Sequence, residues 1–170
     1  MNRITPQHNP ACPAGAVPRR FVDDYLGYLL GQANHALFKD FEAVVREAGL
    51  SSLEWRVLAT LSSQHAMTVG QLAQEVLSQQ PTVTKLLQRL SAQDWVALRD
   101  DPQDQRRTLV SITASGWDKV APLMAQAREH EARCLANLSQ GDVERLKTQL
   151  RQLCHPPVTA SPSPPQTPSA

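Results

Sequence analysis

The chain has 170 residues, of which 41% are hydrophobic and 5% aromatic, and its formal net charge is only +1. This length suits one domain, and the apolar fraction is enough for a hydrophobic core. The weak net charge excludes a uniformly basic nucleic-acid binder, so any basic surface must be local. The sequence has no apolar run of about 18 residues and no hydrophobic signal-peptide core, which predicts a cytoplasmic protein with no membrane partner.

Prolines divide the chain into three parts. Four of the 13 prolines precede residue 19, and six follow residue 155. The last segment cannot bury an apolar face, which predicts a disordered Pro/Ser-rich tail over residues 155–170. Residues 1–18 are expected to form an N-terminal arm, either loose or lying along a partner subunit, and residues 19–154 form the main domain.

Residues 20–48 are expected to form one long helix that is apolar on more than one side and therefore needs cover on more than one side. Its apolar residues are Val22, Leu26, Leu29, Ala33, Leu37, Val44 and Ala48, extended around the helix by Phe21, Tyr25, Tyr28, Phe38, Phe41 and Val45. Residues 114–153 add two helices: one capped by Thr113, with a predicted kink at Pro122, and one that begins at Ser139. This apolar surface exceeds what one small domain can bury, which predicts a homodimer.

Two capping boxes mark the helices between these regions. Ser51 and Glu54 have the required spacing before a second helix, and Thr68 and Gln71 have it before a short support helix. Ser78 is the predicted cap of the helix that follows. Pro81 falls in the first turn of that helix, where the missing N–H has no intrahelical acceptor to lose.

The helix over about residues 78–90 has one apolar face and one polar face. Its apolar residues recur at i, i+3, i+4 and i+7, which predicts burial of Val83, Leu86, Leu87 and Leu90. The other face offers amides and hydroxyls that can read base edges and two cations for phosphates: Gln79, Gln80, Thr82, Thr84, Lys85, Gln88 and Arg89. This surface suits a DNA major groove, and its alternative is an ordinary solvated face.

Two β-prone runs, residues 96–99 and 108–112, flank a turn with Pro and Asp signals. Support helix, reading helix and hairpin follow one another over about residues 51–113. The sequence therefore predicts a winged helix-turn-helix, mainly α with a small β-wing. This order favours the DNA-reading interpretation of the polar helix face over the solvated one.

The wing and the reading helix together resemble the MarR family. The segment RDDPQDQRRTLVSITASG (residues 99–116) looks like the family's D-x-R wing tip, strand and T-x-x-G helix start, and QQPTVTKLLQRL is of its recognition-helix type. The resemblance covers roughly residues 22–153 and implies a homodimeric repressor on double-stranded DNA at a palindromic operator, with recognition helices about 34 Å apart. It also implies that Asp104 pairs with Arg106 and that Arg106 lies near a minor groove, whereas Arg107 is interpreted as solvated.

The same resemblance implies a small aromatic carboxylate or phenolic effector, bound between the first helix, the second helix and the partner subunit. The candidates for its site are Tyr28, His35, Trp55 and Arg56, with His8, Arg19 and Arg20 in second rank. An aromatic wall, a guanidinium and a titratable ring suit such an anion. Alternatively, His35 and Trp55 are ordinary surface or core residues. The overall pattern is similar to the branch that responds to nicotinate-like or hydroxyaromatic acids.

Other functional classes have little support. The sequence has no nucleophile elbow, Walker motif, dinucleotide fingerprint or metal-ligand cluster, so neither an enzyme nor a cofactor or metal is expected. One alternative is a peroxide-sensing MarR-type repressor that uses Cys12 beside Tyr25 and Tyr28, although no adjacent cation favours a thiolate there. Another is an architectural protein that does not bind DNA, which the polar helix face argues against.

Overall fold

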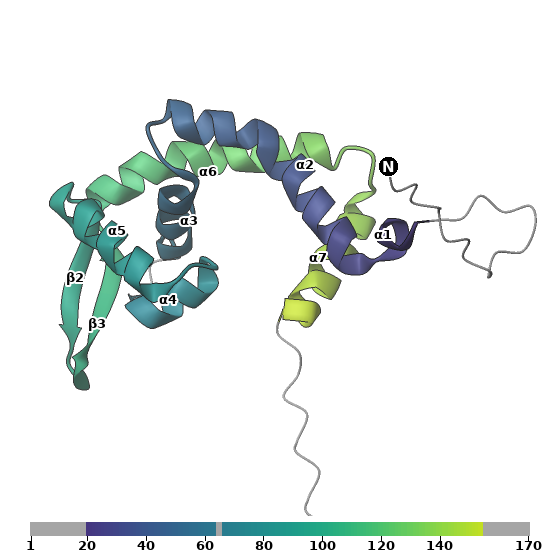
Figure 1. Cartoon of the computed structure of the whole chain (residues 1–170). Coiled ribbons are helices and arrows are strands. Elements are labelled where there is room, and N and C mark those ends of the chain that lie inside the picture. The colour runs from purple at the N-terminus through teal and green to yellow at the C-terminus, as the bar shows by residue number, and fades with distance from the viewer. Residues whose placement is uncertain (1–19, 64–65, 155–170) are drawn as a thin grey trace, which may run out of the picture. The chain divides into compact units, whose positions relative to one another are not determined.

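The computed structural model describes residues 20–63 and 66–154 (Figure 1). The elements in these ranges are α1 (Phe21–Asp24), α2 (Leu26–Glu47), α3 (Ser52–Leu61), β1 (Met67–Thr68), α4 (Val69–Glu75), α5 (Gln80–Ala92), β2 (Val96–Asp101), β3 (Asp104–Ile112), α6 (Ala114–Cys134) and α7 (Gln140–Cys154). They form two compact units, the first ending at Ala127 and the second starting at Arg128. The predicted arm and tail lie outside the described residues, as do His8, Cys12 and Arg19.

We call residues 51–113 the reading head, and its core confirms the predicted apolar face of α5. Val83, Leu86, Leu87 and Leu90 are at most 6% exposed. They belong to one apolar cluster with buried side chains of α3, α4 and the sheet, among them Leu58, Leu72 and Val110. Burial of each such side chain contributes roughly 1.5–3 kcal/mol, so the core fixes which face of α5 remains outside.

The sheet has three antiparallel strands in the order β1-β3-β2. Strands β2 and β3 pair from Val96 opposite Ile112 to Asp101 opposite Asp104, with an irregularity between Asp100 and Asp101. They form the hairpin beside α5 in Figure 1, which confirms the predicted mainly α fold with a β-wing. Val96 and Val110 are buried, so the wing is anchored at its base in the core of the head.

Three predicted helix caps are confirmed, and Ser139, which was predicted as the first residue of the last helix, caps that helix instead. Each hydroxyl accepts a hydrogen bond from the N–H three residues later: Ser51 from Glu54 at 3.3 Å, Thr68 from Gln71 at 3.2 Å, Thr113 from Gly116 at 3.0 Å and Ser139 from Asp142 at 3.2 Å. In the first two, the side chain of the third residue also accepts from the N–H of the cap, completing the capping box. The sequence pattern therefore located these helix starts directly.

The predicted cap at Ser78 is wrong. The N–H of Ser78 donates to the carbonyl of Ala73 at 2.9 Å and thus closes the end of α4. Leu77 adopts a φ of 52°, the left-handed conformation that commonly ends a helix. Helix α5 therefore begins one residue later, with Gln79 as a cap that makes no side-chain hydrogen bond.

The long first helix is interrupted, contrary to the prediction of one helix from residue 20 to 48. Tyr25 separates α1 from α2 with an extended ψ of 113°. Its ring stacks on Phe21, with the ring centroids 5.0 Å apart. The same ring lies 3.1 Å from where a side chain on Gly27 would begin, so the absence of a Cβ there gives the ring room.

The second unit contains the end of α6 and all of α7. Lys147 of α7 forms an ion pair with Glu131 of α6, with 2.9 Å between Nζ and Oε2. Leu146 and Leu153 are 42% and 56% exposed. Helix α6 is continuous through Pro122. Within residues 20–63 and 66–154, no helix is both long and apolar enough to cross a membrane.

Candidate nucleic-acid interface

The outer face of α5 carries the predicted base-reading residues in exposed positions. Burial of the leucine face turns the polar residues outward, namely Gln79, Gln80, Thr82, Thr84, Lys85, Gln88 and Arg89. The hydroxyl of Thr84 donates to the carbonyl of Gln80 within the helix at 2.9 Å. This bond fixes the rotamer of Thr84, so its oxygen remains available only as an acceptor for an outside donor.

A hollow of about 320 Å³ lies where α5, the start of α4 and the wing meet. Its lining combines guanidinium groups with hydroxyls and an amide: Thr68, Val69, Gly70, Gln80, Thr84, Arg106, Arg107 and Thr108. The structure thus brings Gln80 and Thr84 of the reading helix together with Arg106 of the wing, three residues assigned to DNA binding from the sequence. Hydrogen-bonding groups and fixed positive charge in one concave surface suit an anionic backbone with polar base edges.

A second hollow, of about 280 Å³, lies on another side of α5, against the start of α3. It is lined by Ser51, Leu53, Thr82, Lys85, Leu86 and Arg89. Three further predicted DNA-binding residues therefore share a surface, two of them cationic. Lys85 forms no ion pair among the described residues, so its charge is open to an external anion.

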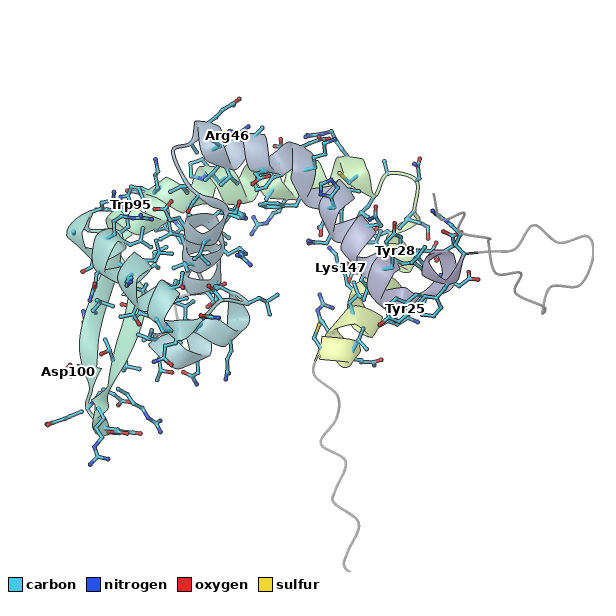
Figure 2. All side chains as sticks on the ribbon, viewed as in Figure 1. Tyr25, Tyr28, Arg46, Trp95, Asp100 and Lys147 are labelled. Atoms are coloured by element: carbon cyan, nitrogen blue, oxygen red, sulfur yellow. The ribbon has the colours of Figure 1, made fainter. Side chains whose placement is uncertain are left out.

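The tip of the wing is held by aspartate carboxylates. Asp101 accepts from the N–H of Gln103 at 2.9 Å, and Asp104 accepts from the N–H of Arg106 at 3.1 Å. Such aspartate bonds to a backbone N–H two residues on stabilise turns. Figure 2 shows the side chains around this tip, near the labelled Asp100.

Asp104 meets Arg106 through the backbone N–H of that residue and not through its guanidinium. The guanidinium that meets Asp104 belongs to Arg107, with 3.2 Å between Nε and Oδ2. Neighbouring side chains of a strand leave it on opposite faces, which favours one of the two arginines at this carboxylate. Arg106 contacts Asp104 through its backbone only, and its guanidinium has no ion partner in the described part of the chain. Arg107, which was interpreted as solvated, is largely exposed and also pairs with Asp104 near the tip of the wing.

Arg89 differs from the other polar residues of α5 because it pairs with Glu54 at the start of α3. Its Nη2 lies 2.8 Å from Oε1 of Glu54. Burial alone would raise the pKa of Glu54, but hydrogen bonds from the amide and hydroxyl of Ser51 and the charge of Arg89 outweigh it and lower the pKa below its ordinary value. The sequence identified Glu54 only as part of a capping box and gave no sign of its partner 35 residues away.

The predicted effector residues are not joined to one another. Trp55 packs edge-on against Phe41, with ring centroids 5.4 Å apart, whereas His35 and Arg56 are exposed. Tyr28, labelled on α2 in Figure 2, is 40% exposed. Within the described residues no hydrogen bond, ion pair or ring contact links any two of these four. The effector site in the sequence analysis therefore stays a prediction.

Two further observations complete the geometry. Arg20, a second-rank candidate, pairs with Asp23, with 2.8 Å between Nη2 and Oδ1. Among the described residues, no group of three or more His, Cys, Asp or Glu side chains has the arrangement of a metal site.

Comparison with known proteins places this geometry in a family. A sequence profile described as MarR family matches residues 48–107. The transcriptional repressor IacR of Pseudomonas putida is 24% identical over 133 residues, which are 78% of this chain and 80% of IacR. The transcriptional activatory protein BadR of Rhodopseudomonas palustris is 31% identical over 124 residues, which are 69% of this chain and 70% of BadR.

A solved structure shares the fold. NadR in complex with 4-hydroxyphenylacetate matches with a TM-score of 0.73 at 22% identity, covering 86% of this chain and 100% of the NadR chain. At this identity the likeness concerns the fold alone. The identity with BadR extends over more than two thirds of both proteins, and the family profile matches most of the reading head. The chain therefore belongs to the MarR family of DNA-binding transcriptional regulators.

Proposed function

We propose that this chain is a homodimeric repressor that binds a palindromic operator through α5 and the wing, and that a small aromatic acid releases it. The main support for this DNA-binding surface is that the proposed base-reading residues lie between two hollows lined by cationic side chains. Gln80 and Thr84 line the hollow with Arg106 and Arg107, and Thr82 lines the one with Lys85. Phosphates flank a helix in a major groove on both sides, so cations on both sides of α5 match that arrangement.

Exposed apolar side chains support the homodimer. On α1 and α2, Tyr25, Leu26 and Leu29 are 53%, 56% and 45% exposed, and in the second unit Leu146 and Leu153 are similarly uncovered. Large apolar side chains exposed on each of these units are expected at an interface. A two-fold dimer would hold two copies of α5 about 34 Å apart, which is one turn of DNA.

The effector proposal rests on chemistry and on the relatives. NadR binds 4-hydroxyphenylacetate, an aromatic carboxylate with a phenol, and IacR is named as a repressor whereas BadR is named as an activatory protein. We assign the effector to the surroundings of Tyr28, His35, Trp55 and Arg56, which offer aromatic faces and a guanidinium for such an anion. Release requires that the effector prefer the spacing of the two heads that does not fit DNA, with a coupling of about 1–3 kcal/mol.

Selection of binding sites from a random duplex pool tests the DNA proposal. We expect a symmetric site whose half-sites are about one helical turn apart, and enrichment of asymmetric single half-sites would contradict the dimeric mode. A panel of hydroxybenzoates and hydroxynicotinates is then titrated against the operator complex, with wild type compared with Arg56→Ala and His35→Ala. A different result would favour the thiol-sensing alternative: no aromatic acid releases the DNA, hydroperoxide does, and Cys12→Ser abolishes the response to hydroperoxide.

A further inference from the structure

Arg89 is the single residue of the outer α5 face that forms an ion pair within the described residues. Its guanidinium is 2.8 Å from the carboxylate of Glu54, and the two side chains are 60% and 11% exposed. The pair joins α5 to the start of α3. A guanidinium engaged in this way is partly neutralised and is held toward α3, and both effects reduce its availability to a phosphate.

Glu54 is a fixed acceptor rather than a mobile surface carboxylate. Its two oxygens serve different partners: Oε2 accepts from the N–H of Ser51 at 2.7 Å, and Oε1 accepts from Arg89 at 2.8 Å. Glu54 also lies on the same side of α3 as Val57, Leu58 and Leu61, which are fully buried. The capping box and the core thus hold this carboxylate in place.

The same short segment also contacts the long helix α2. The hydroxyl of Ser52 donates to Oε1 of Glu42 at 3.1 Å, and Trp55 packs edge-on against Phe41. Residues 51–55 therefore touch α2 through one set of side chains and α5 through Glu54. These contacts place the start of α3 between α2 and the reading helix.

We propose that Glu54 and Arg89 are positioning residues for operator binding: the anchored carboxylate of Glu54 holds Arg89, and through it the outer face of α5, in the orientation that reads DNA. Arg89 then acts as a strut between two helices and not as a phosphate contact. The proposal deepens the DNA-binding role of α5 and rests on it.

A purely electrostatic role and a positioning role of Glu54 predict opposite changes in operator affinity when its carboxylate is removed. If the carboxylate only adds negative charge near DNA, its removal should tighten binding, because phosphates repel it. If it positions α5, its removal should weaken binding. Glu54→Gln isolates this difference, because Gln71 accepts the cap N–H of Thr68 at 2.9 Å and so demonstrates in the same chain that glutamine supports a capping box.

The experiment measures operator affinity as a function of salt for the full chain and four variants: Glu54→Gln, Arg89→Gln, the double variant and Lys85→Gln. We expect Glu54→Gln and Arg89→Gln each to weaken binding about ten-fold, and the double variant to be no weaker than either, as for partners in one interaction. Neither Glu54→Gln nor Arg89→Gln should change the salt slope by more than about half a unit, whereas Lys85→Gln, the matched control on the same helix, should reduce it by about one.

Each result decides the matter. Unchanged or tighter binding by Glu54→Gln, or a slope reduced by about one in Arg89→Gln, overturns the positioning role and returns Arg89 to the phosphate contacts. Arg89 is largely exposed, so its variant answers the question even if Glu54→Gln does not fold. If Lys85→Gln changes neither affinity nor slope, the α5 surface itself is misassigned and this proposal falls with it. If Lys85→Gln reduces the salt slope as expected but Glu54→Gln leaves operator affinity unchanged, only the positioning role is overturned.

Discussion

The reading head and the start of the long helix α2 differ in how far their apolar side chains are buried. In the head, Val57, Leu72 and Val83 have no exposed surface. At the start of α2, Leu26 and Leu29 remain 56% and 45% exposed although their sequence pattern is just as apolar. The same kind of helical stripe is therefore covered in one region and uncovered in the other.

In the head, the chain completes the core by itself, because the helices and sheet of the head pack with Phe41 and Val45 of α2 and with Val120 and Leu123 of α6. The stability of the head should therefore depend on packing within the chain. The apolar side chains at the start of α2 lie outside this core, and in the proposed homodimer a partner would cover them, which would make their contribution depend on protein concentration. Variants in the two regions should therefore fail in different ways.

The largest effect is expected from the core of the head. Leu87→Ala removes a fully packed side chain of α5 and should destabilise the fold by about 2–5 kcal/mol, because a cavity remains. Urea unfolding measures this loss. Leu77→Ala, which changes a leucine that is 85% exposed just before α5, is the control and should change stability little. Equal losses in both variants would contradict the assignment of the core.

A charge placed on the exposed apolar surface of α7 tests whether that surface is covered by a partner. Leu146→Asp should abolish the dimer at a cost of several kcal/mol if that face is buried between subunits, because the carboxylate would lose its water. Sedimentation should then show a monomer whose head remains folded by circular dichroism, and operator binding should fall with the dimer. Glu144→Ala on the same helix is the control. A monomeric variant that still binds the whole palindrome with full affinity would contradict the proposed dimeric mode of binding.

The outer face of the head should carry base preference. A Gln80/Thr82/Thr84 triple alanine variant should lose discrimination between the operator and unrelated DNA, since each good base contact is worth about 1–3 kcal/mol. Competition binding with operator variants measures this. The control is Gln93→Ala, an exposed amide at the end of α5. Unchanged specificity in the triple variant would remove α5 from the role of reading helix.

Local patterns in the sequence predicted much of this structure. The capping boxes at Ser51 and Thr68 depend on residues three apart, and the leucine stripe of α5 depends on residues within two turns, so both are visible without a fold. The wing was also predicted, because strand-prone runs and turn residues are local signals.

The errors came from contacts that sequence spacing does not encode. The partner of Arg89 lies 35 residues away, and the choice of Arg107 over Arg106 at Asp104 depends on which face of β3 each side chain takes. Ser78 has the chemistry of a cap but is used to end α4, because Leu77 turns the chain first. Such choices are made by tertiary packing, which outweighs local preference.

The pH dependence of stability tests the join between α3 and α5. The folded state lowers the pKa of Glu54 from 4.5, so its ionised form stabilises the fold above the unfolded pKa, and this contribution is lost as the pH falls through the lowered value. Glu54→Gln should therefore be less stable than wild type by about 1 kcal/mol at pH 7. Unfolding curves at decreasing pH should converge below 4.5. If the stability difference between wild type and Glu54→Gln stays constant as the pH falls, an ionic role for Glu54 is excluded.

The smallest expected effect concerns the free cation of the reading helix. Lys85→Ala should weaken binding to operator and unrelated DNA alike and should reduce the salt slope of binding by about one unit, because one phosphate contact releases about one counterion. Lys39→Ala on α2 is the matched control, another exposed lysine outside the reading head. If Lys39 and Lys85 change the slope equally, DNA contacts α2 as well as the head. In that case α2 would contribute to DNA binding in addition to its proposed role in assembly.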